Sequence, residues 1–165
     1  MTQSNITVLA VLIGFIAFMA VLIILIDFFL RHRRDRRASR MDELEGHDFE
    51  FFCADLLRAQ GFIDVEVTRG SGDFGVDILA EKDGVTYAVQ CKRYSGPVGV
   101  EAVLRTYGGQ AYYERMVGAV MTNQYFTSPA VEAAKKLRIL LWDRGYMDAM
   151  MEENTPRNGR HHQSS

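Results

Sequence analysis

The first 30 residues contain no lysine or arginine, and residues 6–26 contain no charged residue of either sign. An apolar run of that length can cross a lipid bilayer as a helix. Asp27 ends the run, and six arginines follow within residues 31–40. Cationic residues collect on the cytoplasmic side of a membrane segment. The pattern therefore predicts a transmembrane helix over residues 6–30, with residues 1–5 outside the cytoplasm and the rest of the chain inside it.

The absence of cations ahead of this run also argues against a cleaved signal peptide, because such a peptide begins with a basic segment and carries a shorter apolar region. We therefore expect a single-pass protein of the bacterial inner (cytoplasmic) membrane that contacts the lipid bilayer through residues 6–30. The arginines that follow have two interpretations. They could bind anionic lipid headgroups, or they could serve only to stop translocation.

Cysteine is scarce as well. The chain has two cysteines, Cys53 and Cys91, and no pair with CxxC spacing. Only four histidines accompany them. A zinc site is therefore not expected. Both cysteines lie in apolar sequence, which favours buried free thiols in a reducing compartment.

The part of the chain after the arginines has no excess of positive charge. Residues 41–165 contain 13 basic and 19 acidic residues, which gives a formal charge near −6. This balance argues against a broad, non-specific DNA-binding surface. It remains compatible with a local basic rim around an acidic metal site.

Two apolar runs, residues 76–80 and 86–92, surround a polar turn that contains Asp83-Gly84. An Asp-Gly pair between apolar runs is a strong signal for a β-hairpin. Side chains alternate across a strand, so Ala88, Gln90 and Lys92 are expected to share one face of the second strand.

Three polar residues interrupt these apolar runs: Asp77 in the first and Gln90 and Lys92 in the second. Such groups are costly to bury without partners. A hairpin could bring the Asp77 carboxylate close to the Gln90 amide and the Lys92 ammonium. That combination suits a hard cation and a phosphate group.

The remaining sequence predicts alternating helices and strands around this hairpin. Residues 152–165 show no pattern and are expected to be disordered. The order of one helix, three strands, and then helix, strand, helix, strand implies a mixed sheet with helices on both faces. Outside the hairpin, the expected elements are a helix over 47–59, a strand over 62–68, a glycine-rich loop over 69–75, a helix from Val100 to Ala111 interrupted by Gly108-Gly109, a strand over 117–122, a helix capped at Thr127-Ser128-Pro129 and a strand over 138–143.

Two features next to the hairpin have both a structural and a functional interpretation. The loop over 69–75 contains three glycines. These could provide tight turns, or they could bring backbone amides close to a phosphate. Glu50 lies at the edge of the apolar stripe of the first helix, where its carboxylate could face solvent or lean over the sheet.

Several short motifs, taken together, resemble a known family. They are Gly46-His47-Asp48-Phe49-Glu50, Leu56-Leu57-Arg58-Ala59-Gln60-Gly61-Phe62, Gly70-Ser71-Gly72-Asp73-Phe74-Gly75-Val76-Asp77, Val89-Gln90-Cys91-Lys92-Arg93-Tyr94, Thr122-Asn123-Gln124-Tyr125-Phe126-Thr127 and Leu141-Trp142-Asp143. With these motifs, residues 45–143 resemble the Mrr-like type IV restriction endonuclease domain of the PD-(D/E)XK nuclease superfamily. The GxGDxGxD and QCKRY combination is the specific part of the resemblance.

The resemblance implies an α/β fold with a restriction-endonuclease-like αβββαβ core. It also implies hydrolysis of DNA phosphodiester bonds with Mg²⁺, for which Mn²⁺ could substitute. Asp77 matches the family's metal-binding aspartate, Gln90 occupies a position where many relatives carry Glu or Asp, and Lys92 matches the catalytic lysine. Glu50 matches the helix carboxylate that completes the metal site. Residues next to the site could contact DNA, namely Ser71, Gly72, Asp73, Arg93 and Tyr94. For Arg93 and Tyr94 the alternative is a hydrogen bond at the strand end and packing of the ring.

These observations predict a membrane-anchored, Mg²⁺-dependent DNA endonuclease that restricts foreign or modified DNA. The alternative is a non-cleaving nucleic-acid-binding or sensing module on the same fold, because a fold does not fix a function. Family members often carry a separate recognition domain, for which we expect no room here. Cutting both DNA strands usually needs two active sites, which would make the protein a homodimer. The expected segments are residues 1–5, the membrane helix 6–30, a basic linker 31–44, the endonuclease domain 45–151 and the tail 152–165.

Overall fold

The predicted hairpin forms the middle of a five-stranded sheet in the computed structural model, which describes residues 12–28, 41–68 and 74–153. Its strands are β2 (Ile78–Lys82) and β3 (Val85–Lys92), which pair antiparallel from Lys82 opposite Val85 to Ile78 opposite Val89. Asp83 and Gly84 form the turn, and both have positive φ, at 53° and 75°. This conformation matches the right-handed twist of the strands and favours Asp-Gly. The hairpin prediction is therefore confirmed.

The sheet has the strand order β1-β2-β3-β4-β5. Strand β1 (Ile63–Val67) pairs antiparallel with β2, whereas β4 (Val117–Thr122) pairs parallel with β3 and β5 (Leu140–Trp142) pairs parallel with β4. The parallel pairs are joined through helices α3 (Val100–Tyr112) and α4 (Ser128–Leu137). Strand β3 therefore lies at the centre of the sheet. The mixed sheet that the sequence predicted is confirmed.

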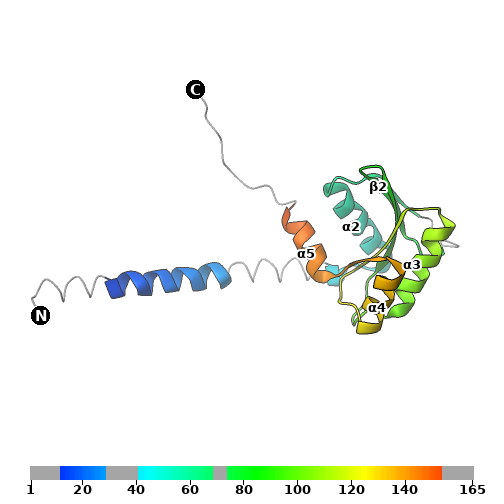
Figure 1. Ribbon diagram of the computed structural model, residues 1–165. Helices are drawn as coiled ribbons and strands as arrows, with labels where there is room; N and C mark the ends of the chain where they lie inside the picture. Colours follow the sequence, from blue (N-terminus) through cyan, green and yellow to red (C-terminus); the bar gives the residue numbers. More distant parts are fainter. Residues whose placement is uncertain (1–11, 29–40, 69–73, 154–165) are drawn as a thin grey trace, which may run out of the picture. The chain divides into compact units, whose positions relative to one another are not determined.

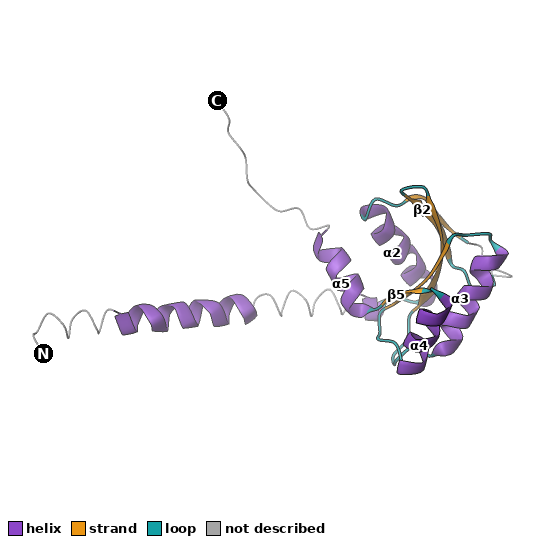
Figure 2. Ribbon diagram, in the orientation of Figure 1, coloured by secondary structure: helices purple, strands orange, loops and turns teal. Residues whose placement is uncertain are grey.

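Helices cover both faces of the sheet (Figures 1 and 2). Helix α2 (Gly46–Ala59) packs on one face together with the buried methionines of α5 (Arg144–Glu153). Helices α3 and α4 pack on the other face, against Val120 and Ile139. The two hydrophobic cores thus lie on opposite sides of the sheet, and the alternation of side chains along β3 and β4 decides which residue enters which core.

Three features of the fold differ from the sequence-based expectation. Helix α3 runs without a break through Gly108 and Gly109, because its packing against the sheet overrides the low helix propensity of glycine. Helix α5 was not expected, and it continues to Glu153, into the tail expected to be disordered. Met41 is fully buried in the core on the α2 side, so the packed domain begins ahead of the expected boundary at residue 45.

The chain divides into two compact units, residues 1–37 and 38–165. In the first unit the described residues, 12–28, form one helix. Within the described part of the chain, no helix is both long enough and apolar enough to cross a membrane. The ends of the predicted 6–30 span, like the expected N-terminal segment 1–5, lie outside the described residues. The transmembrane helix is therefore not confirmed and stays a prediction.

Candidate active site

The Asp77 carboxylate lies beside the backbone of β3. Asp77 precedes β2, and its backbone N–H donates to Val89 O at 2.8 Å, which continues the β2–β3 ladder by one step. Its Oδ2 atom accepts a 2.6 Å hydrogen bond from the Cys91 backbone N–H. The ladder therefore places Asp77 level with residues 89–91 of β3, as the hairpin predicted.

The segment around Asp77 is also held from its other side. Thr68, at the end of β1, donates its backbone N–H to Asp77 O at 2.9 Å and its hydroxyl to Val76 O at 2.7 Å. These bonds join the two ends of the glycine-rich loop. Ser71, Gly72 and Asp73, which could contact DNA, lie outside the described residues.

Gln90 is buried on the α3 face of the sheet, with an exposed fraction of 1%. Its Oε1 atom lies 3.3 Å from the hydroxyl of Thr106, the one partner on α3. A Cβ atom at Gly75 would come within 2.9 Å of Gln90 Nε2, so the glycine leaves room for the amide. Gly75 also has a φ of +77°, which glycine adopts without strain.

Lys92 follows Gln90 by two residues, so strand alternation places its half-buried side chain on the same face. Its backbone carbonyl accepts a 2.6 Å hydrogen bond from the Thr122 hydroxyl on β4. The structure therefore gathers Asp77, Gln90 and Lys92 at one end of the β2–β3 hairpin. The predicted convergence of their carboxylate, amide and ammonium groups on one point stays a prediction.

Glu50 approaches from the opposite face. Its Oε2 atom lies 2.9 Å from His47 Nδ1, one turn earlier on α2, and its side chain is 23% exposed. Its negative charge is the smallest of the causes that raise the pKa of the Cys91 thiol. Glu50 thus comes from the α2 side of β3, whereas Gln90 comes from the α3 side.

The Cys91 thiol lies among these groups, and its pKa is raised well above the ordinary value of 9.0. Burial is the main cause, because it disfavours the thiolate. A hydrogen bond to Cys53, the charge of Cys53, and then the negative charges of Asp77 and Glu50 raise the pKa further. The two cysteines are free thiols and both are buried. Cys91 is therefore a neutral packing residue, as its apolar sequence context predicted.

The site offers oxygen ligands that suit Mg²⁺. The Asp77 carboxylate and the Gln90 amide oxygen are hard donors, one charged and one neutral. Across the described ranges, no group of three or more His, Cys, Asp or Glu side chains is gathered so that it could hold a metal ion. The donors at the end of the hairpin fit a magnesium ion that would keep several of its own water ligands, as Mg²⁺ usually does in proteins.

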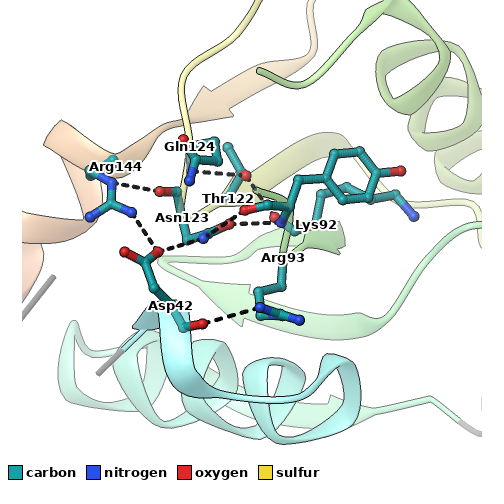
Figure 3. A network of polar contacts seen from close by, with 8 residues as sticks. Asp42, Lys92, Arg93, Thr122, Asn123, Gln124 and Arg144 are labelled. Carbon is teal, nitrogen blue, oxygen red and sulfur yellow. Dashed lines mark hydrogen bonds and ion pairs between the residues drawn. The ribbon is translucent and has the colours of Figure 1, made fainter. Parts of the chain in front are cut away.

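A second polar network fixes the end of β3, and the sequence analysis did not anticipate it (Figure 3). Asn123, buried with 1% exposure, accepts from the Tyr94 backbone N–H at 2.9 Å and donates to Tyr94 O at 3.0 Å. Its Nδ2 also donates to Asp42 Oδ1 at 2.7 Å. Arg144 completes the network by binding both Asn123 O and the Asp42 carboxylate. The side chain of one residue after β4 therefore sets the path of the chain after Lys92.

The two residues after Lys92 have different surroundings. Arg93 donates to the backbone carbonyl of Asp42 at 3.1 Å, which directs it toward the start of the domain. The Tyr94 side chain is 47% exposed, although its backbone is held by Asn123. The predicted DNA contacts of both residues stay predictions.

Comparison with solved structures identifies the architecture. The chain resembles a protein of unknown function, AF1548, with a TM-score of 0.56 and 23% identity, over 65% of each chain. It resembles the MspJI restriction endonuclease, solved in complex with a 27-mer oligonucleotide, with a TM-score of 0.54 and 21% identity, over 72% of this chain and 30% of that one. It also resembles the DNA modification-dependent restriction endonuclease AspBHI, with a TM-score of 0.55 and 19% identity, over 74% of this chain and 35% of that one.

The fold is therefore an α/β fold of the kind found in restriction endonucleases. The chain spans about two thirds of AF1548 and about a third of the two restriction enzymes. No curated protein matches its sequence. The family model Mrr_cat, described as a restriction endonuclease, matches residues 41–151. The chain belongs to this family, and the match supports a DNA endonuclease active in restriction.

Proposed function

We propose that this protein is a Mg²⁺-dependent DNA endonuclease whose active site is formed by Asp77, Gln90 and Lys92. One observation carries the proposal: the β2–β3 ladder brings the Asp77 carboxylate to Cys91 N, between Gln90 and Lys92 along β3. Binding or assembly alone would not require a lysine beside a carboxylate and an amide. Mn²⁺ would be expected to replace Mg²⁺ at a site of this kind.

Each residue has a distinct task. Asp77 and Gln90 would hold the cation, which when bound lowers the pKa of a water ligand and offsets phosphate charge. Lys92, on the same face as Gln90, would hold the attacking water or stabilise the negative charge that develops on the phosphate. Glu50 would reach the site from α2. Its negative charge already contributes to the raised pKa of Cys91. With one neutral ligand in place of a carboxylate, we expect weaker metal binding than at a site with two acidic ligands.

Plasmid cleavage tests this proposal. The full chain, purified in detergent, would be incubated with supercoiled plasmid in Mg²⁺, in Mn²⁺ and in EDTA, beside Lys92→Ala. We expect nicking or linearisation that requires the metal and disappears in the variant. Methylated and unmethylated plasmids would then test whether modified DNA is the substrate. DNA binding that is indifferent to metal and to Lys92→Ala would instead favour the alternative, a non-cleaving nucleic-acid-binding or sensing module.

We further propose that residues 6–30 anchor the enzyme in the membrane, so that it meets DNA at or crossing the inner membrane. The uncharged residues 6–26 and the arginines after residue 30 support this proposal. We expect the full-length protein to sediment with membranes and to resist extraction by high salt. Recovery in the soluble fraction would contradict anchoring without affecting the assignment of the nuclease site.

Dimerisation is a separate proposal, which follows from the need for two active sites to cut both strands. Sedimentation of the protein with and without DNA would test it. A monomer that only nicks plasmid would contradict the homodimer and leave a single-strand endonuclease.

A further inference from the structure

Thr106 lies between the main chain of α3 and the amide of Gln90. The residue is fully buried, and its hydroxyl is 2.8 Å from Ala102 O and 3.3 Å from Gln90 Oε1. In the present orientation of the Gln90 amide, Ala102 O and Gln90 Oε1 are both hydrogen-bond acceptors. A hydroxyl group carries one proton and can donate it to only one acceptor. One of the two contacts therefore lacks a proton.

The distances show which contact has the proton. An O–H···O hydrogen bond is usually about 2.7–2.8 Å long, whereas an N–H···O bond extends to about 3.2 Å. The 2.8 Å contact to Ala102 O fits the hydroxyl as donor. The 3.3 Å contact is long for a hydroxyl donor and closer to the length expected of an amide N–H donor. Thr106 would then accept a hydrogen bond from Gln90 rather than donate one.

The two branches of Thr106 have different surroundings. A Cβ atom at Gly118 on β4 would come within 2.6 Å of Ile139 Cδ1, 2.7 Å of Gln110 Oε1 and 3.3 Å of Thr106 Cγ2, so the methyl group is one of three groups that close this space. The hydroxyl is directed by its 2.8 Å hydrogen bond to Ala102 O, which a serine at this position could also make. A half-turn of the Gln90 amide exchanges two groups of nearly equal size, and the hydrogen-bond network decides between them.

We propose that Thr106 is a positioning residue that turns the Gln90 amide so that Nε2–H donates to Thr106 Oγ1 and Oε1 is presented to a divalent cation bound at Asp77. In this orientation Oε1 takes the place next to Gly75, where a Cβ atom would come within 2.9 Å of the amide. Gly75 stands two residues before Asp77. Thr106 thus makes an amide, which has only one oxygen, act as a metal ligand. The inference rests on the proposed function of the same site.

The inference is tested by comparing the effect of Thr106→Val in the wild-type protein with its effect in the Gln90→Glu variant. A carboxylate has two equivalent oxygens and needs no such orientation, so Gln90→Glu should remove the dependence on Thr106. The affinity of the full chain for Mn²⁺ alone would be measured by calorimetry for Thr106→Val, in the wild-type and in the Gln90→Glu background. Thr106→Ser, which keeps the hydroxyl, and Thr86→Val, which removes a hydroxyl at the far end of β3, are the matched controls.

Loss of the partner that orients a metal ligand typically weakens metal binding by about 10–100-fold. We expect a loss of about that size for Thr106→Val in the wild-type background, and less than about threefold in the Gln90→Glu background. Thr106→Ser and Thr86→Val should stay near wild type. Thr106→Ala gives the same comparison if the valine variant does not fold, and circular dichroism checks folding for each variant.

The outcomes separate the two proposals. An equal loss in both backgrounds would mean that Thr106 acts only on packing, and would overturn this inference alone. Unchanged Mn²⁺ affinity in Thr106→Val would do the same. Absence of any Mn²⁺ binding by the wild-type chain, together with intact plasmid, would overturn the nuclease assignment and this inference with it.

Discussion

Gly109 of α3 lies directly against the backbone of Phe74. A Cβ atom at residue 109 would come within 2.8 Å of Phe74 O and would also overlap the Val76 side chain. The absence of a side chain therefore lets the helix approach the segment that leads into Asp77. The sequence suggested an interruption of the helix at the two glycines. The structure shows instead a close contact with the segment that leads into Asp77, the proposed metal ligand.

The two adjacent glycines predict opposite effects of the same substitution. Gly109→Ala should lower the free energy of unfolding by about 1–3 kcal/mol, because the added methyl group overpacks a tight contact. Gly108 has no atom within 4 Å of an added Cβ. Gly108→Ala should therefore raise stability by up to about 1 kcal/mol through helix propensity. Urea unfolding of both variants measures the difference, and the same sign for both would contradict the packing argument.

Asp77→Asn should separate metal binding from folding. The asparagine oxygen can still accept the hydrogen bond from Cys91 N, whereas the negative charge is lost. Removing a residue that only hydrogen-bonds to a metal ligand weakens metal binding by about 10–100-fold. Removing the charge of the ligand itself should therefore lower the Mn²⁺ affinity by at least about tenfold. The exposed Asp55→Asn on α2 is the control. Equal affinities in titration calorimetry would remove Asp77 from the site.

The network behind β3 predicts a large cost for a small truncation. Asn123→Ala removes three side-chain hydrogen bonds in a buried position. Each buried partner of Asn123 that is left without a hydrogen bond costs up to about 1–3 kcal/mol. We expect the free energy of unfolding to fall by about 2–4 kcal/mol in total. Gln124→Ala, at the next position, should change it by less than about 0.5 kcal/mol. A similar, small effect for both variants would show that the network does not hold the end of β3.

The raised pKa of Cys91 predicts a pH dependence of stability above neutrality. The folded thiol stays protonated above its ordinary pKa of 9.0, whereas the unfolded thiol ionises there. Above about pH 9 the unfolded chain thus binds fewer protons, and the free energy of unfolding falls as the pH rises. Removing the thiol in Cys91→Ala should reduce this slope by up to about 1.4 kcal/mol per pH unit. If the free energy of unfolding falls equally steeply between pH 8 and 10 in the wild type and in Cys91→Ala, this prediction is wrong.

The hairpin, and the placing of Asp77 and Gln90 at one end of it, could be predicted from the sequence. Both depend on interactions between residues close together in the chain. The turn at Asp83-Gly84 and the alternation along β3 were enough to bring Asp77 level with Gln90. The family resemblance added Glu50, and the structure places it on α2, which packs on the opposite face of the sheet from Gln90 and α3. That distinction depends on how α2 packs, which no local pattern contains.

The supporting residues could not be predicted, for a related reason. Asp42, Asn123 and Arg144 come together from positions up to 102 residues apart. Thr106 did carry a signal: with Ala102, Val103 and Gly109 it forms the buried stripe of α3, and a hydroxyl within such a stripe requires a polar partner. The identity of that partner depends on the helix meeting β3.

The ion pair between Asp42 and Arg144 joins the beginning of the domain to the start of its last helix. The segment that enters the domain is therefore held by the start of α5. What precedes residue 41 can then change without rebuilding β3 or the segment that leads into β2. A fragment that starts at residue 45 would lack Asp42 and lose this closure, so a minimal functional unit should begin no later than Met41.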